Sequence, residues 1–587
     1  MDAILRISRV RVAALPARLN GELIRVTVIV LVISLLFWHR LAERDLWGSH
    51  EARAAQDAQR MLDDGAWGLP RLFNDDADMQ KPPLFYWLAA TAGWLNGGVD
   101  AVSVRLLPAL SASLCVALVY FVLRRRGRPL AAFIAALTLA TAQHFTWLAR
   151  TARIDMPLTL AVAVAVLAVV ESRRWRAVGF VAMAAGLLLK GPVGLVLPLA
   201  VFVLAAFVEC LVNLRIRAQP CRTLSPRLCG GRRQDEGGEL VASAESPTPC
   251  PLPRKARGEG AQVRLPRGSV GSLLWGVPLA LALSLPWFIW ASATTHGEFF
   301  RVFFWYHNVQ RALGGADELA VHPLWYYGPR LLVDALPASL VLLPAAVVFI
   351  RRGLWRTDSL ARLGLVWLVA VVAVMSCAKF KRADYLLPAY PGLAIFLGCV
   401  GEQVWLAGRP QLRRQLAIGL ATALAVVAGT WIYLLHVELP RHEPERELRS
   451  FARAIREVAP APQVVLFFRA EAHALSFHLG RPVNTFLEWE NLDVWAGEPG
   501  PHFVVMPPDC AARWRQHLSA GELEEVLRST DLNGGRHERP LVLMRTRPKS
   551  ETRDAPPRQQ TADRARGDLR GAAGPEPVGP PGPCAHG

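Results

Sequence analysis

The chain has 587 residues, of which 52% are hydrophobic and only 19% charged, and its mean hydropathy is positive. Apolar runs of about 20 residues recur along most of it, which is typical of a polytopic membrane protein and excludes an ordinary soluble protein. The formal net charge of +18 does not indicate nucleic-acid binding, because the arginine clusters lie between apolar runs. The nine cysteines show no CxxC pair and no metal-ligand spacing, so neither a disulfide framework nor a zinc site is expected.

Eleven apolar runs are predicted to be membrane spans, each close to the length that crosses a bilayer. They cover 22–41, 102–123, 129–148, 155–171, 176–190, 192–212, 271–293, 326–349, 359–378, 384–405 and 414–436. Arginine-rich connections alternate with less basic ones, and the N-terminal segment 1–21 is basic, so this side is predicted to be the cytoplasm. Basic residues precede the first run, but no small-residue cleavage site is evident, so this run is expected to remain as an uncleaved span.

The spans divide into a first transmembrane part, 22–212, and a second, 271–436. Between them, 213–270 is rich in Pro, Gly, Ser and Arg without apolar periodicity, which predicts a disordered cytoplasmic insert. Residues 437–548 have the composition of a small soluble domain, with one helical pattern (ERELRSFARAIREVA) and three short apolar runs (QVVLFF, HFVVMPP and PLVLMRT) that predict strands. The tail 549–587 is predicted to be disordered.

The predicted fold class is therefore an α-helical polytopic membrane protein with a small C-terminal α/β domain on the periplasmic side. Connections that alternate with the cytoplasmic ones face outward, so their unusual charges should converge on one face of the membrane. These residues are Glu51, Arg153, Lys190, His307, Arg311, Lys379 and Lys381.

The first outer loop, 42–101, is too rich in Trp, Phe, Leu and Met for a linker, and we interpret it as a folded active-site loop at the membrane surface. Its stretch EARAAQDAQRML has helical spacing, which places Glu51 and Arg53 in a first turn where a carboxylate is favoured. Glu51 is then either a helix-terminal acid with no further task or, with His50, a candidate general base.

Several cations on the predicted outer side are candidates for phosphate binding. Lys81 precedes two prolines that fix an extended turn, and either snorkels or binds a phosphate as a compact charge. Lys190, Lys379 and Lys381 lie there against the positive-inside tendency, which favours a phosphate or an anionic lipid headgroup over simple snorkelling.

Two further stretches carry polar residues that are unusual so close to a membrane. Asp155 begins the fourth span beside Arg150 and Arg153, which indicates a paired polar cluster. His307 and Arg311 share a helical face within FFWYHNVQR. A lone histidine is usually structural, but the neighbouring arginine and three aromatic residues favour substrate contact.

Taken in order, these stretches resemble the membrane glycosyltransferases related to protein O-mannosyltransferases and to the lipid A aminoarabinose transferase (glycosyltransferase families 39 and 83). The first loop, with QKPPLFYW at its end, is similar to the family's acidic-pair, arginine and EKPP block. The resemblance covers most of 20–440, whereas the insert 213–270 and the tail 549–587 lie outside it. The further matching stretches are RIDMP (153–157), LKGPVG (189–194), HNVQR (307–311) and KRADYLLPAYP (381–391).

The resemblance implies a GT-C fold and transfer of a sugar from a polyprenyl-phosphate carrier to an envelope lipid, glycan or protein, outside the bacterial inner membrane. Such chemistry needs an activated acceptor and cations that stabilise the phosphate leaving group. Partners are then the bilayer, the lipid-linked sugar and the acceptor; no nucleic acid and no tightly bound cofactor is expected. Residues matching family positions are Glu51, Arg53, Lys81, Asp155, Lys381 and Tyr385.

Two positions depart from the family pattern. His50 stands where the family has the aspartate expected to be the base, and Gln80 replaces the glutamate of EKPP. The base is then His50 or Glu51, or the acceptor differs, and the loss of two carboxylates weakens the case for a divalent metal, which stays open. The retained cations argue against an inactive enzyme.

We therefore predict a lipid-linked-sugar-dependent glycosyltransferase. The alternative is a non-catalytic protein that binds polyprenyl phosphate, as a flippase would, whereas a secondary transporter is disfavoured because no inverted repeat is evident. The predicted catalytic residues are Glu51, His50 and Asp155. The predicted donor-binding residues are Arg53, Lys81, Lys190, Lys379, Lys381 and Tyr385, with weaker substrate contacts from His307, Arg311 and Arg153.

Overall fold

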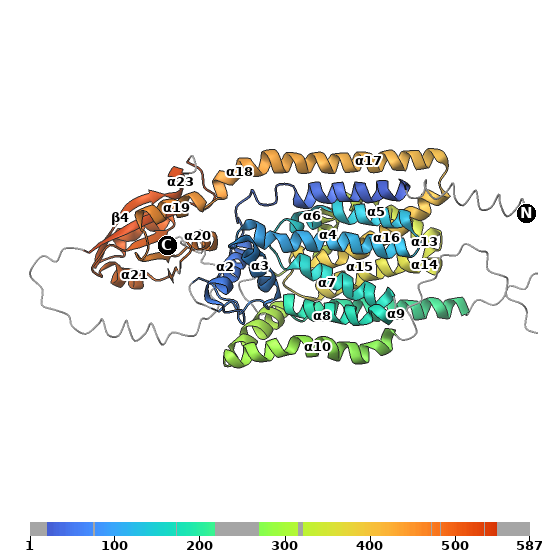
Figure 1. Ribbon diagram of the computed structural model, residues 1–587, viewed down its shortest axis with the longest axis horizontal. Coiled ribbons are helices and arrows are strands. Elements are labelled where there is room, and N and C mark those ends of the chain that lie inside the picture. Colours follow the sequence, from blue (N-terminus) through green and yellow to red (C-terminus); the bar gives the residue numbers. More distant parts are fainter. Residues whose placement is uncertain are drawn as a thin grey trace, which may run out of the picture.

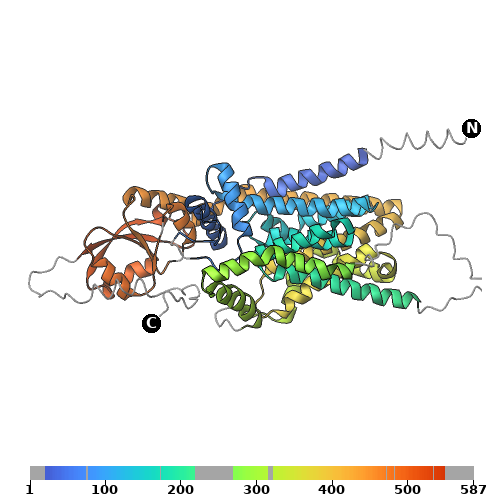
Figure 2. The ribbon, with the colours of Figure 1, turned by 60° about the horizontal axis from the view of Figure 1, so that its bottom comes forward.

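A long helical bundle and a small sheet domain lie end to end in the computed structural model (Figure 1). Helices α2 (Ser49–Asp64) and α3 (Leu84–Asn96) lie between the two parts. The same order is visible from a second direction, in which α10 (Ser269–Thr294) runs along one side of the bundle (Figure 2). The described residues are 20–73, 77–171, 173–217, 269–314, 321–470, 472–481, 483–532 and 535–548.

The bundle consists mainly of long apolar helices that follow the long axis of the molecule (Figure 1). Its long and short helices are Asn20–Trp38, α4 (Ala101–Arg125), α5 (Pro129–Thr141), α6 (Gln143–Ala149), α7 (Asp155–Glu171), α8 (Arg176–Lys190), α9 (Val193–Arg217), α10, α12 (Tyr327–Asp334), α13 (Leu342–Arg351), α14 (Leu354–Thr357), α15 (Ser359–Cys377), α16 (Tyr390–Ala407) and α17 (Pro410–Tyr433). Shorter segments connect them, among them the π-helical Phe300–Gln310, α11 (Arg311–Leu313) and the 3-10 segment Ala383–Ala389.

Within the described part, seven helices are long and apolar enough to cross a membrane, or up to nine if each of two bent pairs is one span. The bends measure 68° between α5 and α6 and 108° between Leu324–Asp334 and Ala338–Arg351. The two breaks meet, since the backbone N–H of Gln143 donates to the carbonyl of Leu336 at 2.9 Å. The chain is thus a multi-pass membrane protein, and the number of eleven spans remains a prediction because α8 and the apolar part of α7 are shorter.

Small residues bring the central helices into backbone contact, as is usual for helices in a membrane. A Cβ atom added to Gly364 of α15 would lie 2.6 Å from the backbone nitrogen of Phe396 and 2.7 Å from the carbonyl oxygen of Gly392, both on α16. The buried indole of Trp367 donates to the carbonyl of Pro388 at 2.8 Å. These contacts anchor the segment 383–389, which reaches the cavity described below.

The segments predicted to be disordered fall mainly outside the described residues. Helix α9 continues to Arg217 and α10 begins at Ser269, so the ends of the predicted insert 213–270 are helical. The rest of that insert, the N-terminal residues up to 19 and the tail 549–587 lie outside the described part.

The C-terminal domain contains a five-stranded mixed sheet with the strand order β2-β1-β3-β5-β4. Strand β1 is parallel to β2 and β3, whereas β5 is antiparallel to β3 and β4. The three predicted strands form β1 (Val465–Phe468), β3 (Phe503–Met506) and β5 (Val542–Pro548). The prediction missed β2 (Thr485–Phe486), which is too short for a pattern, and β4 (Gly521–Arg528), whose Glu and Leu residues favour a helix.

Helices cover both faces of this sheet, because alternate side chains of a strand point to opposite faces. On β1, Val465 and Phe467 pack with α19 (Arg449–Val458) and α20 (His473–Leu479), while Leu466 and Phe468 pack with the helices on the other side. The remaining helices of this part are α18 (Leu439–Arg446), α21 (Trp489–Ala496), α22 (Pro508–Arg513) and α23 (Ser529–Leu532).

The sheet domain is attached to the first outer loop through Asp45, which is 1% exposed. Its Oδ1 accepts hydrogen bonds from Nε of Arg449 and from Nε2 of His478, both at 2.9 Å. Burial alone would raise the pKa of Asp45, but these two partners hold it well below its ordinary value. A second contact comes from Gln56 of α2, whose amide donates to the carbonyl of His473 at 2.8 Å.

We expect Asp45→Asn to loosen the sheet domain, because the amide keeps the size of the side chain but loses the charge that Arg449 and His478 bind. Hydrogen bonds to a charged group contribute about 1.5–3 kcal/mol each. Limited proteolysis should then cleave the connection near 439–448 faster than in the parent protein. The control is Asp531→Asn, which changes an exposed carboxylate of the same domain; equal cleavage of both variants would contradict the attachment.

Candidate active site

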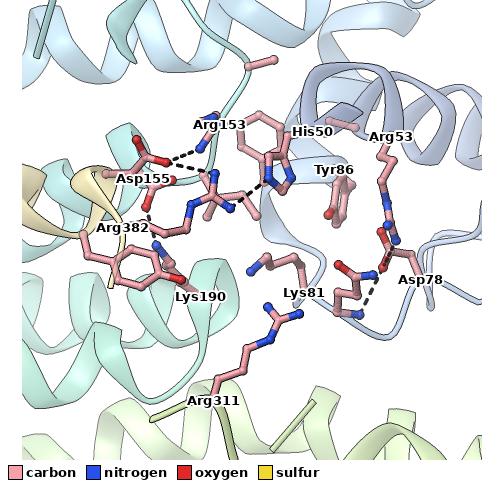
Figure 3. A pocket seen from close by; sticks show the side chains of 17 residues that line it. His50, Arg53, Asp78, Lys81, Tyr86, Arg153, Asp155, Lys190, Arg311 and Arg382 are labelled. Atoms are coloured by element: carbon pink, nitrogen blue, oxygen red, sulfur yellow. Dashed lines mark hydrogen bonds and ion pairs between the residues drawn. The ribbon is translucent and has the colours of Figure 1, made fainter. Parts of the chain in front are cut away.

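A polar cavity lies beside α2 and α3, and side chains from several segments point into it (Figure 3). Its empty space, including the part open to solvent, is about 730 Å³. Its lining combines residues that are far apart in the sequence. They come from α2, the loop 77–83, α3, the turn 152–155, the end of α8, α11 and the segment 382–385.

A second chamber of about 800 Å³ adjoins the first, and its remaining wall is largely apolar. The apolar side chains are Leu158, Val193, Phe303, Met375, Phe380 and Pro388. The residues that line both chambers are Gln80, Lys81, Asp155, Lys190, Arg311 and Tyr385. Cationic side chains therefore stand at the boundary between a polar and an apolar space.

Helix α2 places two adjacent candidates in different environments. It begins after Gly48, which is extended, and ends before Gly65, whose φ of 64° is a left-handed conformation that glycine adopts without strain. Successive helical residues differ in direction by about 100°. His50 consequently lines the cavity, whereas Glu51 points into the protein.

The carboxylate of Glu51 is 1% exposed and is bound by two arginines. Arg44 donates to both oxygens at 2.9 and 3.1 Å, Arg105 does so at 2.9 and 3.1 Å, and the N–H of Ala152 adds a bond of 2.9 Å. Burial by itself would raise the pKa of Glu51, but the charges of Arg44 and Arg105 lower it to about 2. The interpretation of Glu51 as a general base is therefore corrected: it does not line the cavity, and it joins α2 to α4 and to the turn before α7.

His50 reaches the cavity as a neutral ring. A guanidinium N–H of Arg382 donates to its Nε2 at 3.3 Å, so in the neutral ring the proton resides on Nδ1. Burial, followed by the charges of Arg153, Arg382 and Lys81, lowers the pKa of His50 to about 3. Its basic lone pair is thus already engaged, which makes His50 a weak base in this state.

One wall of the cavity carries two groups of ion pairs (Figure 3). Lys190 at the end of α8 binds Asp155 at the start of α7, and its ammonium lies 4.3 Å from the ring centre of Tyr385. The predicted cluster at Asp155 thus has Lys190 as its cation, and Arg153 pairs elsewhere.

Asp384 is the centre of the second group. It binds Arg153 directly and lies 3.5 Å from Nη2 of Arg382. Nε2 of His144, on α6, lies 3.2 Å from its other oxygen. Asp384 therefore holds two arginines on the wall, and one of these contacts His50.

The opposite wall is formed by Arg53, Asp78, Gln80 and Tyr86 (Figure 3). Arg53 binds Asp78 at 3.0 Å, and the side-chain oxygen of Gln80, turned toward the same guanidinium, accepts at 3.0 and 3.1 Å. The backbone N–H of Gln80 also donates to Asp78 at 3.1 Å. Behind this wall lies Asp57, which is completely buried.

Lys81 and Arg311 lie between the two walls, and within the described part neither makes an ion pair with a carboxylate. Burial and the nearby charge of Lys190 lower the pKa of Lys81 to about 8. The guanidinium of Arg311 lies over Tyr306 at 5.5 Å. The first chamber is thus lined by six cationic and three acidic side chains, an excess of three positive charges.

His307 and Asn308 line the second chamber, close to Arg311. Burial, followed by the charges of Arg311 and Lys81, lowers the pKa of His307 to about 3, so this ring is also neutral. Nδ1 of His307 has no hydrogen-bond partner in the part of the chain that the structure describes.

The described residues contain no group of three or more His, Cys, Asp or Glu side chains placed to hold a metal ion. In the first chamber each of the three carboxylates is bound by a cation. The side chains of this chamber therefore do not fit a divalent metal.

The chain is similar to known proteins both in sequence and in fold. The family model Dolichyl-phosphate-mannose-protein mannosyltransferase matches residues 25–217. In structure, the chain is similar to ArnT from Cupriavidus metallidurans bound to undecaprenyl phosphate, with a TM-score of 0.66 and 19% identity over 91% of this chain and 99% of that one. The chain therefore has the fold of ArnT.

Curated relatives are similar in sequence to about 70% of the chain. An undecaprenyl phosphate-alpha-4-amino-4-deoxy-L-arabinose arabinosyl transferase of Pectobacterium carotovorum is 29% identical over 440 residues, which are 70% of this chain and 66% of that protein. One from Pseudomonas aeruginosa is 26% identical over 431 residues, 71% and 67% of the two chains. The chain thus spans about two thirds of the length of these relatives.

Two predicted phosphate ligands do not line either chamber. Lys379 is exposed, and Lys381 is 3% exposed with its ammonium donating to the carbonyls of His322, at 2.9 Å, and Ala378. The assignment of Lys379 and Lys381 to the cavity is therefore corrected. The backbone at Arg382 is extended, so neighbouring side chains point to opposite sides, and Arg382 reaches the cavity instead.

Sequence reasoning also missed Asp78, Tyr86 and Asp384 as residues of the cavity wall. Asp384 lies within the matched stretch KRADYLLP and Asp78 two residues before Gln80, so their positions near recognised motifs were the available signal. Neither pattern says which cation each acid binds, because Arg153 and Arg53 come from other segments.

We expect Glu51→Gln to destabilise the fold, because it leaves Arg44 and Arg105 without their counter-charge; breaking a buried pair costs about 3–5 kcal/mol. The lowered pKa means that the stabilisation is present above the ordinary pKa of the group and is lost as the pH falls through about 2. Thermal unfolding in detergent measures the effect, with the exposed Asp63→Asn of α2 as the control. A variant of unchanged stability without activity would restore the base role of Glu51.

Proposed function

We propose that the protein transfers a sugar from a polyprenyl-phosphate donor to an anionic acceptor at the outer face of the bacterial inner membrane. The observation that carries this proposal is the cavity with its excess of three positive charges, directly beside an apolar chamber. The names of the relatives, which are undecaprenyl phosphate-aminoarabinose transferases, support a 4-amino-4-deoxypentose as the transferred sugar.

The order of the two chambers supports one orientation of the donor. The apolar chamber suits the first units of the polyprenyl chain, because its walls are aliphatic and aromatic. Lys81, Lys190 and Arg311, which line both chambers, are then placed to bind the phosphate. The sugar extends into the polar chamber between the wall that carries Arg153 and Arg382 and the wall that carries Asp78.

The same cations account for the reaction. Breaking the bond between the anomeric carbon and the phosphate oxygen leaves polyprenyl phosphate with one additional negative charge. Lys81 and Arg311 make no ion pair within the described part, so their charges are available to stabilise that leaving group. Lys190 can contribute in addition, while its bond to Asp155 keeps it in place.

The cavity favours an acceptor whose attacking oxygen is already ionised. Each carboxylate on its wall is bound by a cation, and the lone pair of His50 is engaged by Arg382, so the chamber presents no strong base. A phosphate group on an envelope lipid such as lipid A needs no deprotonation, and the excess positive charge can bind it together with the donor phosphate. We assign to His50 a hydrogen bond to the substrates, not removal of a proton.

The arginine-rich connections of the sequence, which are expected in the cytoplasm, indicate which side of the membrane the cavity faces. Helices α2 and α3, which contribute to the cavity lining, and the sheet domain lie at the opposite end of the bundle from the C-terminal end of α4, which carries Arg124 and Arg125 (Figure 1). This supports a periplasmic position for the cavity and the sheet domain.

The function is tested with purified protein in lipid nanodiscs, undecaprenyl phosphate-linked 4-amino-4-deoxypentose and lipid A. Mass spectrometry should find lipid A heavier by one aminopentose, and no product with lipid A whose phosphates have been removed. Transfer to the dephosphorylated lipid would overturn the ionised acceptor. Binding of undecaprenyl phosphate without any transfer would favour a non-catalytic carrier protein.

We expect Lys81→Gln to weaken binding of undecaprenyl phosphate by about tenfold or more, because a hydrogen bond from a cation contributes about 1.5–3 kcal/mol. The matched control is Lys379→Gln, which removes the same charge from an exposed position outside both chambers. Binding is measured by titrating the lipid into nanodiscs that contain each variant. If both variants lose equal affinity, a general surface charge and not the cavity binds the phosphate.

A further inference from the structure

Two acidic side chains meet in the wall that faces the proposed sugar position. Asp57 lies seven residues after His50 on α2, which puts both on the same helical face together with Arg53. Asp78 lines the cavity, and Asp57 lies behind it within hydrogen-bond reach. Arg53 binds Asp78 at 3.0 Å, so the wall holds two carboxyl groups and one cation.

Asp57 is unusual because it is completely buried and neither oxygen has a partner that donates to it within the described part. Burial and the negative charge of Asp78 raise the pKa of Asp57 well above its ordinary value, which favours its protonated form. For Asp78, burial acts in the same direction, but the charge of Arg53 and the N–H of Gln80 lower its pKa. Two carboxyl groups in contact beside one cation therefore favour one proton and one negative charge for the pair.

Such a pair does not serve stability. An acid whose pKa is raised by folding makes the folded state less stable as the pH rises above the pKa of the unfolded chain. Natural proteins retain destabilising groups of this kind mainly where function needs them. The pair lies next to the cavity, whose wall includes Asp78 and Tyr86, so a functional role at this cavity is expected (Figure 3).

We propose that Asp78, backed by Asp57, selects a donor sugar that carries a positively charged amino group. This inference rests on the proposed function, since it assumes that the sugar lies between the two walls. Elsewhere in the chamber an ammonium group would meet an excess of positive charge. At Asp78 it would find a carboxylate, and its arrival would favour loss of the proton from Asp57, which gives the pair a second negative charge.

A hydroxyl group cannot produce this effect, because it brings no charge that would stabilise an ionised Asp57. The pair therefore distinguishes an amino group from a hydroxyl group of nearly the same size. Tyr86 and Arg53, the other polar groups beside the pair, do not make this distinction: the first is neutral and the second repels a cation.

The test compares the binding of two lipids to the full-length protein in nanodiscs. One is undecaprenyl phosphate-linked 4-amino-4-deoxypentose, and the other carries the same pentose with a hydroxyl group in place of the amino group. We expect the parent protein to bind the amino lipid about tenfold or more tightly, as a charge-assisted hydrogen bond provides. Asp78→Asn should reduce this ratio to near one without weakening the binding of undecaprenyl phosphate itself.

Asp57→Asn adds a second readout, because the amide resembles the protonated acid but cannot ionise. It should raise the midpoint of thermal unfolding and at the same time lower the preference for the amino lipid. Asp63→Asn, on the exposed face of the same helix, should change neither.

Three results would overturn the inference: equal binding of both lipids by the parent protein, an unchanged ratio in Asp78→Asn, or equal effects of Asp57→Asn and Asp63→Asn. Failure of the proposed function gives a different result. In that case the parent protein would bind the amino lipid but would transfer no sugar to any phosphorylated acceptor.

Discussion

The cavity depends on one buried carboxylate, that of Glu51. Because Arg44 and Arg105 bind it from two sides and Ala152 donates to it, α2, α4 and the turn before α7 meet at a fixed point. The residues next to this point in the sequence then form the cavity walls. His50 and Arg53 stand on one side, and Arg153 on the other. A side chain that resembles a catalytic acid in the sequence thus holds the walls of the cavity together.

The second constraint is the excess of positive charge in a partly buried chamber. Placing cations close together away from water is unfavourable, and the pKa of Lys81, lowered to about 8 partly by Lys190, reflects this repulsion. Ion pairs to Asp155, Asp78 and Asp384 neutralise only part of the charge. An anionic ligand would neutralise the remainder, and relief of this repulsion would then contribute binding energy for the proposed phosphate.

The acids of the site are distributed differently from the pattern of the family that the chain resembles. His50 and Gln80 occupy the positions where that pattern has carboxylates, while Asp57 and Asp78 place two acids on the wall beneath Arg53. This distribution removes strong bases from the neighbourhood of the cations proposed to bind phosphate, and it concentrates negative charge near the proposed sugar position. A phosphate acceptor and an amino sugar would both suit such a separation of charge.

Much of the architecture follows from the sequence alone, because long apolar runs must cross the bilayer as helices and apolar runs at 463–468, 502–508 and 540–546 must be buried as strands. The clustering of Arg153, Lys190 and Arg311 also follows, since alternate connections must face the same side. The bends between α5 and α6 and within 324–351 were not predicted, because each run is continuous in hydropathy.

Which member of each charged stretch reaches the cavity was decided only by the tertiary structure. The sequence does not distinguish Glu51 from a general base, because Arg105, which binds it in the folded protein, lies 54 residues further along the chain. Lys381 and Arg382 differ little as cations, yet one is buried among carbonyl groups and the other contacts His50. The sequence therefore determines the side of the membrane on which the charges gather. The direction of each side chain depends on the local backbone and on partners distant in the chain, and these are fixed only when the helices pack.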